Sequence, residues 1–317
     1  MGSDIEQVIS EDIQIDPSFK TERCYLRITA AQVKRRLCMT KHYGVDSFCE
    51  RTINNVLNRI GYTLKKILKT KPLRKIPETD AIFENIASHH ATAGKNPKIL
   101  RISIDTKAKV KVGALSRRGY SRMKKVPVAY DHDQNWEATL VPFGVYELNT
   151  DQVTLLFGNS KETSDFIVDA LEQWWQIRKD DLAHYDEILI DLDNGKASAG
   201  NTKRFLKRMV DFSQSIHKPI QLVYYPPYHS KYNPIERVWA ALENYWNGLI
   251  LDTIPNTLNI ARHMAWKGFN PIVQLIDSVY EKGLPAPSLQ EIKELEKFIV
   301  KHLYLKKWDV KIFPTIN

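Results

Sequence analysis

The chain has little cysteine. Its 317 residues include three cysteines, Cys24, Cys38 and Cys49, which are separated by 14 and 11 residues. These spacings fit neither a C-x-x-C pair nor the paired ligands of a zinc site. We therefore expect unreactive thiols in a reducing compartment, and the sequence does not indicate a small disulfide-stabilised domain.

Long hydrophobic runs are absent as well. No apolar stretch approaches the roughly 18 residues that a transmembrane helix needs. The start, Met1–Glu6, lacks the basic region and the apolar core of a signal peptide. The content of 43% apolar and 26% charged residues is that of an ordinary globular protein. We expect one large or two unequal domains in the cytoplasm, with no membrane partner.

The motifs of several common enzyme classes are also missing. The sequence contains neither a Walker loop nor a G-x-G-x-x-G fingerprint, and it shows no Ser-His-Asp arrangement. His229 has no evident partner that would make it a catalytic base. The chemistry of this chain is therefore expected from other side chains.

Acidic residues are scarce in one strongly basic segment. The net charge is +9, and residues 101–125 contain nine basic residues against the single acid Asp105. A second basic run covers residues 65–75. A charge run alone often marks only a solvated face, but two such runs near acidic residues favour a polyanionic partner. The predicted DNA contacts in the first segment are Lys107, Lys109, Lys111, Arg117, Arg118, Lys124 and Lys125.

Residues 224–239, YYPPYHSKYNPIERVW, form the most informative segment that is present. They read as the end of a strand, a rigid Pro-Pro turn, a polar loop and the start of a helix. Asn233 is expected to be the N-cap and Pro234 the first helical residue. Glu236 then lies in the first turn, where the helix dipole favours a negative charge. His229 and Lys231, in the loop, are predicted neighbours of DNA.

Two further carboxylates lie at the ends of expected strands, Asp105 in residues 100–106 and Asp193 in residues 187–193. Strand ends meet at one edge of a sheet, so these acids and Glu236 are expected to converge. Close carboxylates repel each other unless they share a divalent cation, and oxygen ligands suit Mg²⁺ or Mn²⁺. Two such ions about 3.5–4 Å apart can promote phosphodiester chemistry. Asp191 remains an alternative to Asp193 because both lie on one strand face, and each acid alone is also typical of a turn or a cap.

The N-terminal part reads as helical. Residues 29–38 and 48–60 show helical periodicity, a Gly-containing turn joins them, and a short strand is expected from Gly61. Two short helices joined in this way are typical of a helix-turn-helix, or of any small helical hairpin. In the first interpretation, Arg51, Asn54 and Asn55 on the second helix contact DNA.

The remaining order of elements is strand, hairpin, helix, strand, helix, strand, helix. This order predicts an α/β fold with a mixed sheet flanked by helices. The expected strands are 100–106, 144–148, 152–158, 187–193 and 220–225, and the expected helices are 77–95, 163–176, 202–216 and 234–246.

The chain resembles the DDE transposases of ISAzo-type insertion sequences, within the mariner-like group. The resemblance covers Ile28 to Asp252. It is carried by Asp193-Asn194-Gly195, residues 224–239, Ile104–Gly113, Tyr130–Asp133, Pro142–Tyr146 and the pair Trp174-Trp175. It implies that residues 96–255 form an RNase H-like catalytic core and that the helix-turn-helix-like region 26–95 binds DNA. The sequence pattern itself predicts a loose lead-in (1–25) and a basic, mostly helical C-terminal region (256–317).

The resemblance also implies the chemistry. Asp105, Asp193 and Glu236 would hold Mg²⁺ or Mn²⁺ as a pair of ions. Metal-activated water would carry out strand cleavage, and the freed 3′-hydroxyl would attack target DNA. Element ends and target DNA would be the partners, the active form would be a homodimer on DNA, and the protein would associate with the bacterial nucleoid when bound. A catalytically silent copy that only binds DNA is the alternative. Family members usually carry a further helical region before the part that matches Ile28, so we expect an N-terminally shortened chain.

Overall fold

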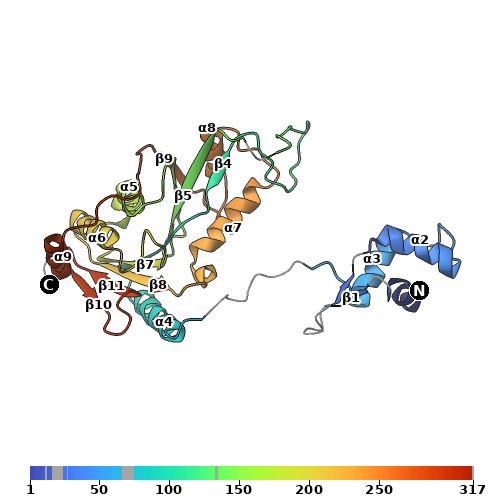
Figure 1. The fold of residues 1–317 in the computed structure, drawn as a ribbon, viewed down its shortest axis with the longest axis horizontal. Coiled ribbons are helices and arrows are strands. Elements are labelled where there is room, and N and C mark those ends of the chain that lie inside the picture. Colours follow the sequence, from blue (N-terminus) through green and yellow to red (C-terminus); the bar gives the residue numbers. More distant parts are fainter. Residues whose placement is uncertain (11–12, 16–23, 27, 66–74, 133–134, 316–317) are drawn as a thin grey trace. The chain divides into compact units, whose positions relative to one another are not determined.

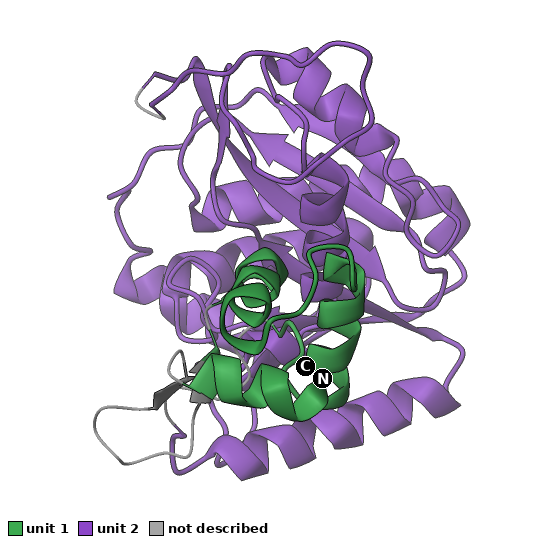
Figure 2. Ribbon diagram, turned by 90° about the vertical axis from the view of Figure 1, so that its right-hand side faces the viewer, with its two compact units in different colours: residues 1–71 green, residues 72–317 purple. Residues whose placement is uncertain are grey.

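The computed structural model describes residues 1–10, 13–15, 24–26, 28–65, 75–132 and 135–315. The chain divides into two compact units, Met1–Lys71 and Pro72–Asn317 (Figure 2).

In the described residues of the first unit, three helices pack around a small apolar core. Its elements are α1 (Gly2–Ile9), β1 (Ile13–Ile15), β2 (Cys24–Leu26), α2 (Ala30–Lys41) and α3 (Glu50–Arg59). The core contains Ile53 and Val56 of α3 and Val33 and Leu37 of α2, so the expected stripes on these two helices are confirmed. Helix α2 begins at a capping box in which Thr29 and Gln32 bond reciprocally.

Two expectations for this unit are wrong. The lead-in is not loose over its first residues, because α1 buries Ile5 and Ile9, one helical turn apart, in the same core. No strand follows Gly61 in residues 61–65, and the rest of that expected strand lies outside the described residues. Gly61 has φ +97°, a conformation that ends a helix more readily than it starts a strand.

The second unit is built on one mixed sheet (Figure 1). Its described strands pair in the order β10-β11-β8-β7-β3-β5-β6-β9, and β4 pairs with β5. Strand β5 runs antiparallel to β3 and β6, whereas β3, β7 and β8 are parallel. The strands are β3 (Ile99–Thr106), β4 (Val110–Val112), β5 (Ala138–Glu147), β6 (Val153–Gly158), β7 (Glu187–Asp193), β8 (Ile220–Tyr225), β9 (Ile272–Ile276), β10 (Ile299–Lys301) and β11 (Asp309–Ile312). This arrangement confirms the expected RNase H-like mixed sheet and its hairpin.

Helices cover both faces of the sheet. They pack on the apolar side chains of the strands, which alternate between the two faces from one residue to the next. In β6, Leu155 and Phe157 belong to the core beneath α7 and α8, whereas Leu156 belongs to the larger core with α5 and α6. Helix α4 packs on β8 and β3. The helices are α4 (Thr79–Lys95), α5 (Ser164–Leu182), α6 (Lys203–Ile216), α7 (Ile235–Trp246), α8 (Ile254–Arg262) and α9 (Leu289–Leu295), with 3₁₀ turns η2 (Ser230–Tyr232) and η3 (Glu296–Phe298).

Two boundaries differ from the expected domains. Helix α4 was expected within a DNA-binding region over residues 26–95, but it belongs to the second unit. Residues 256–317 were expected to be mostly helical, yet β9 pairs with β6 and β11 pairs with β8. Both added strands are rich in β-branched residues and cover strands that would otherwise be edges. None of the helices in the described part of the chain combines the length and hydrophobicity that a membrane span requires.

Candidate active site

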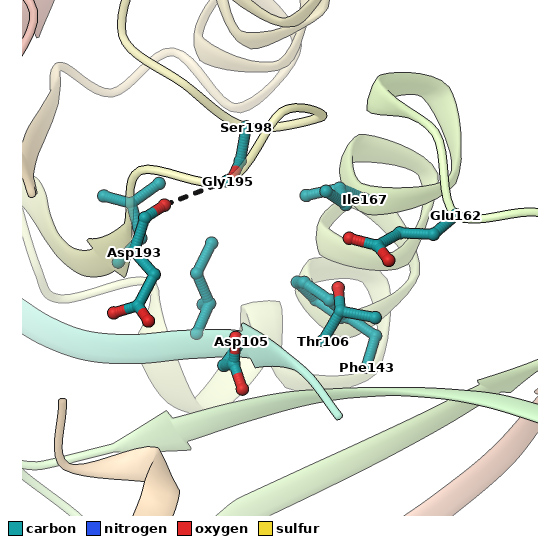
Figure 3. A pocket seen from close by; sticks show the side chains of 10 residues that line it. Asp105, Thr106, Phe143, Glu162, Ile167, Asp193, Gly195 and Ser198 are labelled. Atoms are coloured by element: carbon teal, nitrogen blue, oxygen red, sulfur yellow. Dashed lines mark hydrogen bonds between the residues drawn. The ribbon is translucent and has the colours of Figure 1, made fainter. Parts of the chain in front are cut away.

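The carboxyl ends of β3 and β7 meet at one edge of the sheet. These strands are parallel neighbours, so Asp105 near the end of β3 and Asp193 at the end of β7 lie at the same edge. Both line a cavity of about 50 Å³ together with Thr106 and Phe143 (Figure 3). The structure therefore brings together two acids that are 88 residues apart in the sequence.

Glu236 lies in the first turn of α7 and acts on both aspartates through its charge. Burial, followed by the charges of Asp193 and Glu236, raises the pKa of Asp105 to about 8. Burial and the charge of Glu236 raise the pKa of Asp193 to about 6. Glu236 is not among the residues that line the cavity, and its link to the two aspartates is through its charge.

This donor set fits a hard divalent cation. Buried carboxylates that repel one another gain most from a shared positive charge, and their oxygens are the ligands that Mg²⁺ and Mn²⁺ prefer. Across the residues that the structure describes, no group of three or more His, Cys, Asp or Glu side chains is arranged so that it could hold a metal ion. The three carboxylates therefore match a divalent cation in their chemistry, but their arrangement here is not that of a metal-bound site.

The alternative ligand Asp191 has a different role. Its side chain is 0% exposed and both of its oxygens are engaged. Oδ1 lies 2.8 Å from His90 Nε2 on α4, and Oδ2 accepts hydrogen bonds from Arg101 at 2.6 and 2.9 Å. Asp191 is thus the anchor of a buried ion pair, and Asp193 is the acid that reaches the cavity.

Asn233 does not cap α7 with its side chain as expected. Its Oδ1 accepts from Ser103 Oγ at 2.5 Å, and its Nδ2 donates to Ile104 O at 3.0 Å and to Asp193 Oδ1 at 3.4 Å. Ser103 takes over the capping, since its Oγ accepts from Ile235 N–H at 2.9 Å. The start of α7 is therefore bonded to β3 and to the acidic site.

His229 is a correction to the predicted DNA contacts. Its side chain is 3% exposed, Nδ1 lies 2.7 Å from Pro227 O, and the ring packs against Phe83 and Tyr232. These contacts stabilise the loop between β8 and α7 and bury the ring, so His229 is not retained as a DNA contact. Lys231, two residues on, is exposed.

Two of the predicted basic contacts are engaged in ion pairs. Glu243 on α7 lies 2.6 Å from Lys107 Nζ and 2.8 Å from Arg117 Nη2, and the Lys107 side chain is only 12% exposed. The guanidinium of Arg117 also lies over the ring of Trp246. The predicted contacts of the basic segment that remain exposed are Lys109, Lys111, Arg118, Lys124 and Lys125, and Arg122 is exposed as well. Arg51, Asn54 and Asn55 are exposed on α3 of the first unit.

Sequence reasoning missed several residues of this site. Glu162, just before α5, lines the same cavity (Figure 3), and Trp239 donates a hydrogen bond from Nε1 to Asp105 Oδ2 at 2.9 Å. Glu236 and Trp239 are three residues apart in α7 and therefore lie on one side of the helix, and this spacing was the available signal for Trp239. No local pattern marked Glu162.

We expect the metal-free protein to lose stability as the pH rises from about 4 to about 8. The pKa of Asp105 is about 8 in the fold, above its ordinary value of 3.8. Its favourable contribution is therefore complete below the ordinary value and is lost as the pH rises through about 8. Thermal unfolding in EDTA over this range tests this expectation. Asp105→Asn should unfold at a higher temperature than wild type at the alkaline end, and an unchanged profile would contradict the assignment.

Comparison with known proteins gives one family match. A family model described as the Rhodopirellula transposase DDE domain matches residues 4–314. This match extends beyond the expected span of 28–252 at both ends. None of the curated proteins compared with the chain matches it.

Solved structures with a similar arrangement are distant in sequence. The "Mos1 transposase paired-end complex with left transposon end" is 10% identical, with 80% of this chain and 68% of that chain covered and a TM-score of 0.43. The "Mos1 mariner paired end complex with Mn" is 9% identical, with 74% and 70% covered and a TM-score of 0.42. The corresponding complex "with Mg" is 10% identical, with 80% and 68% covered and a TM-score of 0.40. Likeness at this level assigns no residue.

Proposed function

The chain belongs to the Rhodopirellula transposase DDE domain family, and from this membership we propose that Asp105, Asp193 and Glu236 are the acidic residues of its active site. It is a DDE-type DNA transposase. The observation that carries the residue assignment is the shared cavity of Asp105 and Asp193, with the charge of Glu236 raising the pKa of both.

The proposal includes divalent metal ions held by these three carboxylates. Similar structures are described with Mn and with Mg, and the buried oxygen donors of this chain suit either ion. We propose two ions, because a pair can assist both the attacking and the leaving oxygen of a phosphodiester. The protein's own part is to hold the acids at one sheet edge and to keep Asp105 and Asp193 largely out of bulk water.

DNA is the proposed substrate, as element ends and as target. The exposed basic side chains of residues 109–125 supply positive charge on the same unit as the acids. The exposed face of α3, with Arg51, Asn54 and Asn55, is the proposed reader of the element end. Cutting both ends of an element in one event makes a homodimer on DNA part of this proposal.

The test is cleavage and joining of labelled element-end DNA by the purified chain. We expect nicking that requires Mg²⁺ or Mn²⁺ and stops in EDTA, followed by joining of the 3′ end to a second duplex. Binding without cleavage under every metal condition would favour the silent DNA-binding alternative. Cleavage without joining would indicate a nuclease on the same fold.

A separate prediction concerns the basic segment. Joint substitution of Lys124 and Lys125 by Ala should weaken DNA affinity and lower the slope of log affinity against log salt by up to about 1.8, because each phosphate contact contributes roughly 0.9. The control is Lys179→Ala, an exposed lysine on α5 outside the segment. Fluorescence anisotropy over a salt series measures both quantities. Equal slopes for the double variant and the control would remove these lysines from the DNA surface.

A further inference from the structure

Three polar residues at the start of α7 and just before it lie near the acidic site. Glu236 and Trp239 are three residues apart in the first turns of α7 and therefore share one side of the helix, and Asn233 lies two residues before the helix begins. Glu236 is itself one of the three acids. The other two residues each contact one of the aspartates, Asn233 on Asp193 and Trp239 on Asp105.

The ring of Trp239 is held in place by close packing against Gly144. Its side chain is 4% exposed, and its ring lies where Gly144 of β5 leaves room. A Cβ at Gly144 would lie 2.7 Å from the ring, closer than any carbon contact allows. Because this packing fixes the ring, its Nε1–H donates to Asp105 Oδ2 at 2.9 Å, and this hydrogen bond restricts the rotation of the carboxylate.

Asn233 is held by hydrogen bonds. It is 1% exposed, accepts from Ser103 Oγ, and donates to the carbonyl of Ile104 next to Asp105. The same amide donates to Asp193 Oδ1 over a longer 3.4 Å. Asn233 therefore joins the ends of β3 and β7 to the start of α7.

We infer that Trp239 and Asn233 are positioning residues that orient Asp105 and Asp193 relative to Glu236 for metal binding. Helix α7 and Asn233, which lies just before it, then set the geometry of the three carboxylates, so this segment does more than supply one ligand. This inference rests on the proposed function, because it assumes that the three acids bind the metal. Outer partners that orient metal ligands typically change metal affinity by about 10–100-fold when they are removed.

The chain offers a matched control for Trp239. Trp246 lies on the same helix, is fully buried, and its Nε1 has no hydrogen-bond partner. Trp239→Phe and Trp246→Phe both keep an aromatic ring and remove one N–H. Only the first removes a contact with a proposed metal ligand. Asn233→Ala is paired with Asn244→Ala, which removes the same side chain at an exposed position on α7.

Calorimetric titration of the DNA-free chain with Mn²⁺ tests the inference. We expect Trp239→Phe and Asn233→Ala to weaken Mn²⁺ binding by about 10-fold or more, whereas both controls bind as wild type does. Melting curves in EDTA identify any variant that fails to fold, and in that case the other variant decides. Unchanged Mn²⁺ affinity in both, or equal losses in Trp239→Phe and Trp246→Phe, would overturn the positioning role. If Asp105→Asn itself retains full Mn²⁺ affinity, the proposed metal site fails instead.

Discussion

Glu236→Gln and Asp193→Asn each reduce metal-dependent cleavage of an element end by on the order of a thousandfold, with DNA affinity nearly unchanged. This is the expected result because each substitution removes a negative charge that the metal ions require while keeping the size of the side chain. Metal stabilisation of a phosphodiester transition state amounts to several kcal/mol, and about 1.4 kcal/mol corresponds to tenfold in rate. Single-turnover cleavage of labelled DNA at saturating protein measures the loss.

The control for this pair is Asp180→Asn, an exposed acid at the end of α5. It should cleave as wild type does, which separates a loss at the site from a general effect of removing a charge. Anisotropy on the same DNA shows whether binding is retained. If either site variant cleaves within a fewfold of wild type, that residue is not a required metal ligand.

Asp191→Asn is expected to destabilise the fold without removing a metal ligand. The substitution leaves the charge of Arg101, whose side chain is 21% exposed, without the fully buried carboxylate that it pairs with. Breaking a buried pair from one side typically costs about 3–5 kcal/mol. Since Arg101 retains some access to water, we expect a loss near the lower end, about 3 kcal/mol. This corresponds to a decrease in Tm of roughly 6–12 °C for a unit of this size.

The comparison with Asp193→Asn makes this prediction specific. That substitution removes a buried charge and its repulsion with Glu236, which together raise the pKa of Asp193 to about 6 in the fold, so the metal-free Tm should be equal or higher. Thermal melts in EDTA and cleavage assays below the lower Tm give both readouts. A stable but inactive Asp191→Asn, together with an active Asp193→Asn, would exchange the two assignments.

The sheet and the place of the acids could be predicted from local patterns. Residues 187–193 are mostly apolar and end in an acid, which is typical of a buried strand that leads to a site. Parallel pairing of this strand with β3 then brings Asp105 and Asp193 to one edge of the sheet. Period-two alternation did not separate Asp191 from Asp193. Their difference depends on Arg101 and His90, which only the fold brings to Asp191.

Other features depend on contacts between distant segments. Asn233 has the sequence context of an N-cap, but Ser103, 130 residues earlier, competes for that role and directs the amide into the site. Lys107 and Arg117 looked available for DNA until α7 placed Glu243 between them. Strands β9 and β11 pair with β6 and β8, and local propensity does not show that these two strands need a further partner.

The most direct measurement is the anomalous difference density of a crystal grown with Mn²⁺. The proposed function predicts Mn²⁺ peaks coordinated by oxygens of Asp105, Asp193 and Glu236, with two peaks if the site holds a pair of ions. Glu162, which lines the same cavity, serves as an internal comparison because it is not among the proposed ligands. Peaks that are bound elsewhere, or that omit both Asp193 and Glu236, would contradict the assignment of these three carboxylates as the metal site.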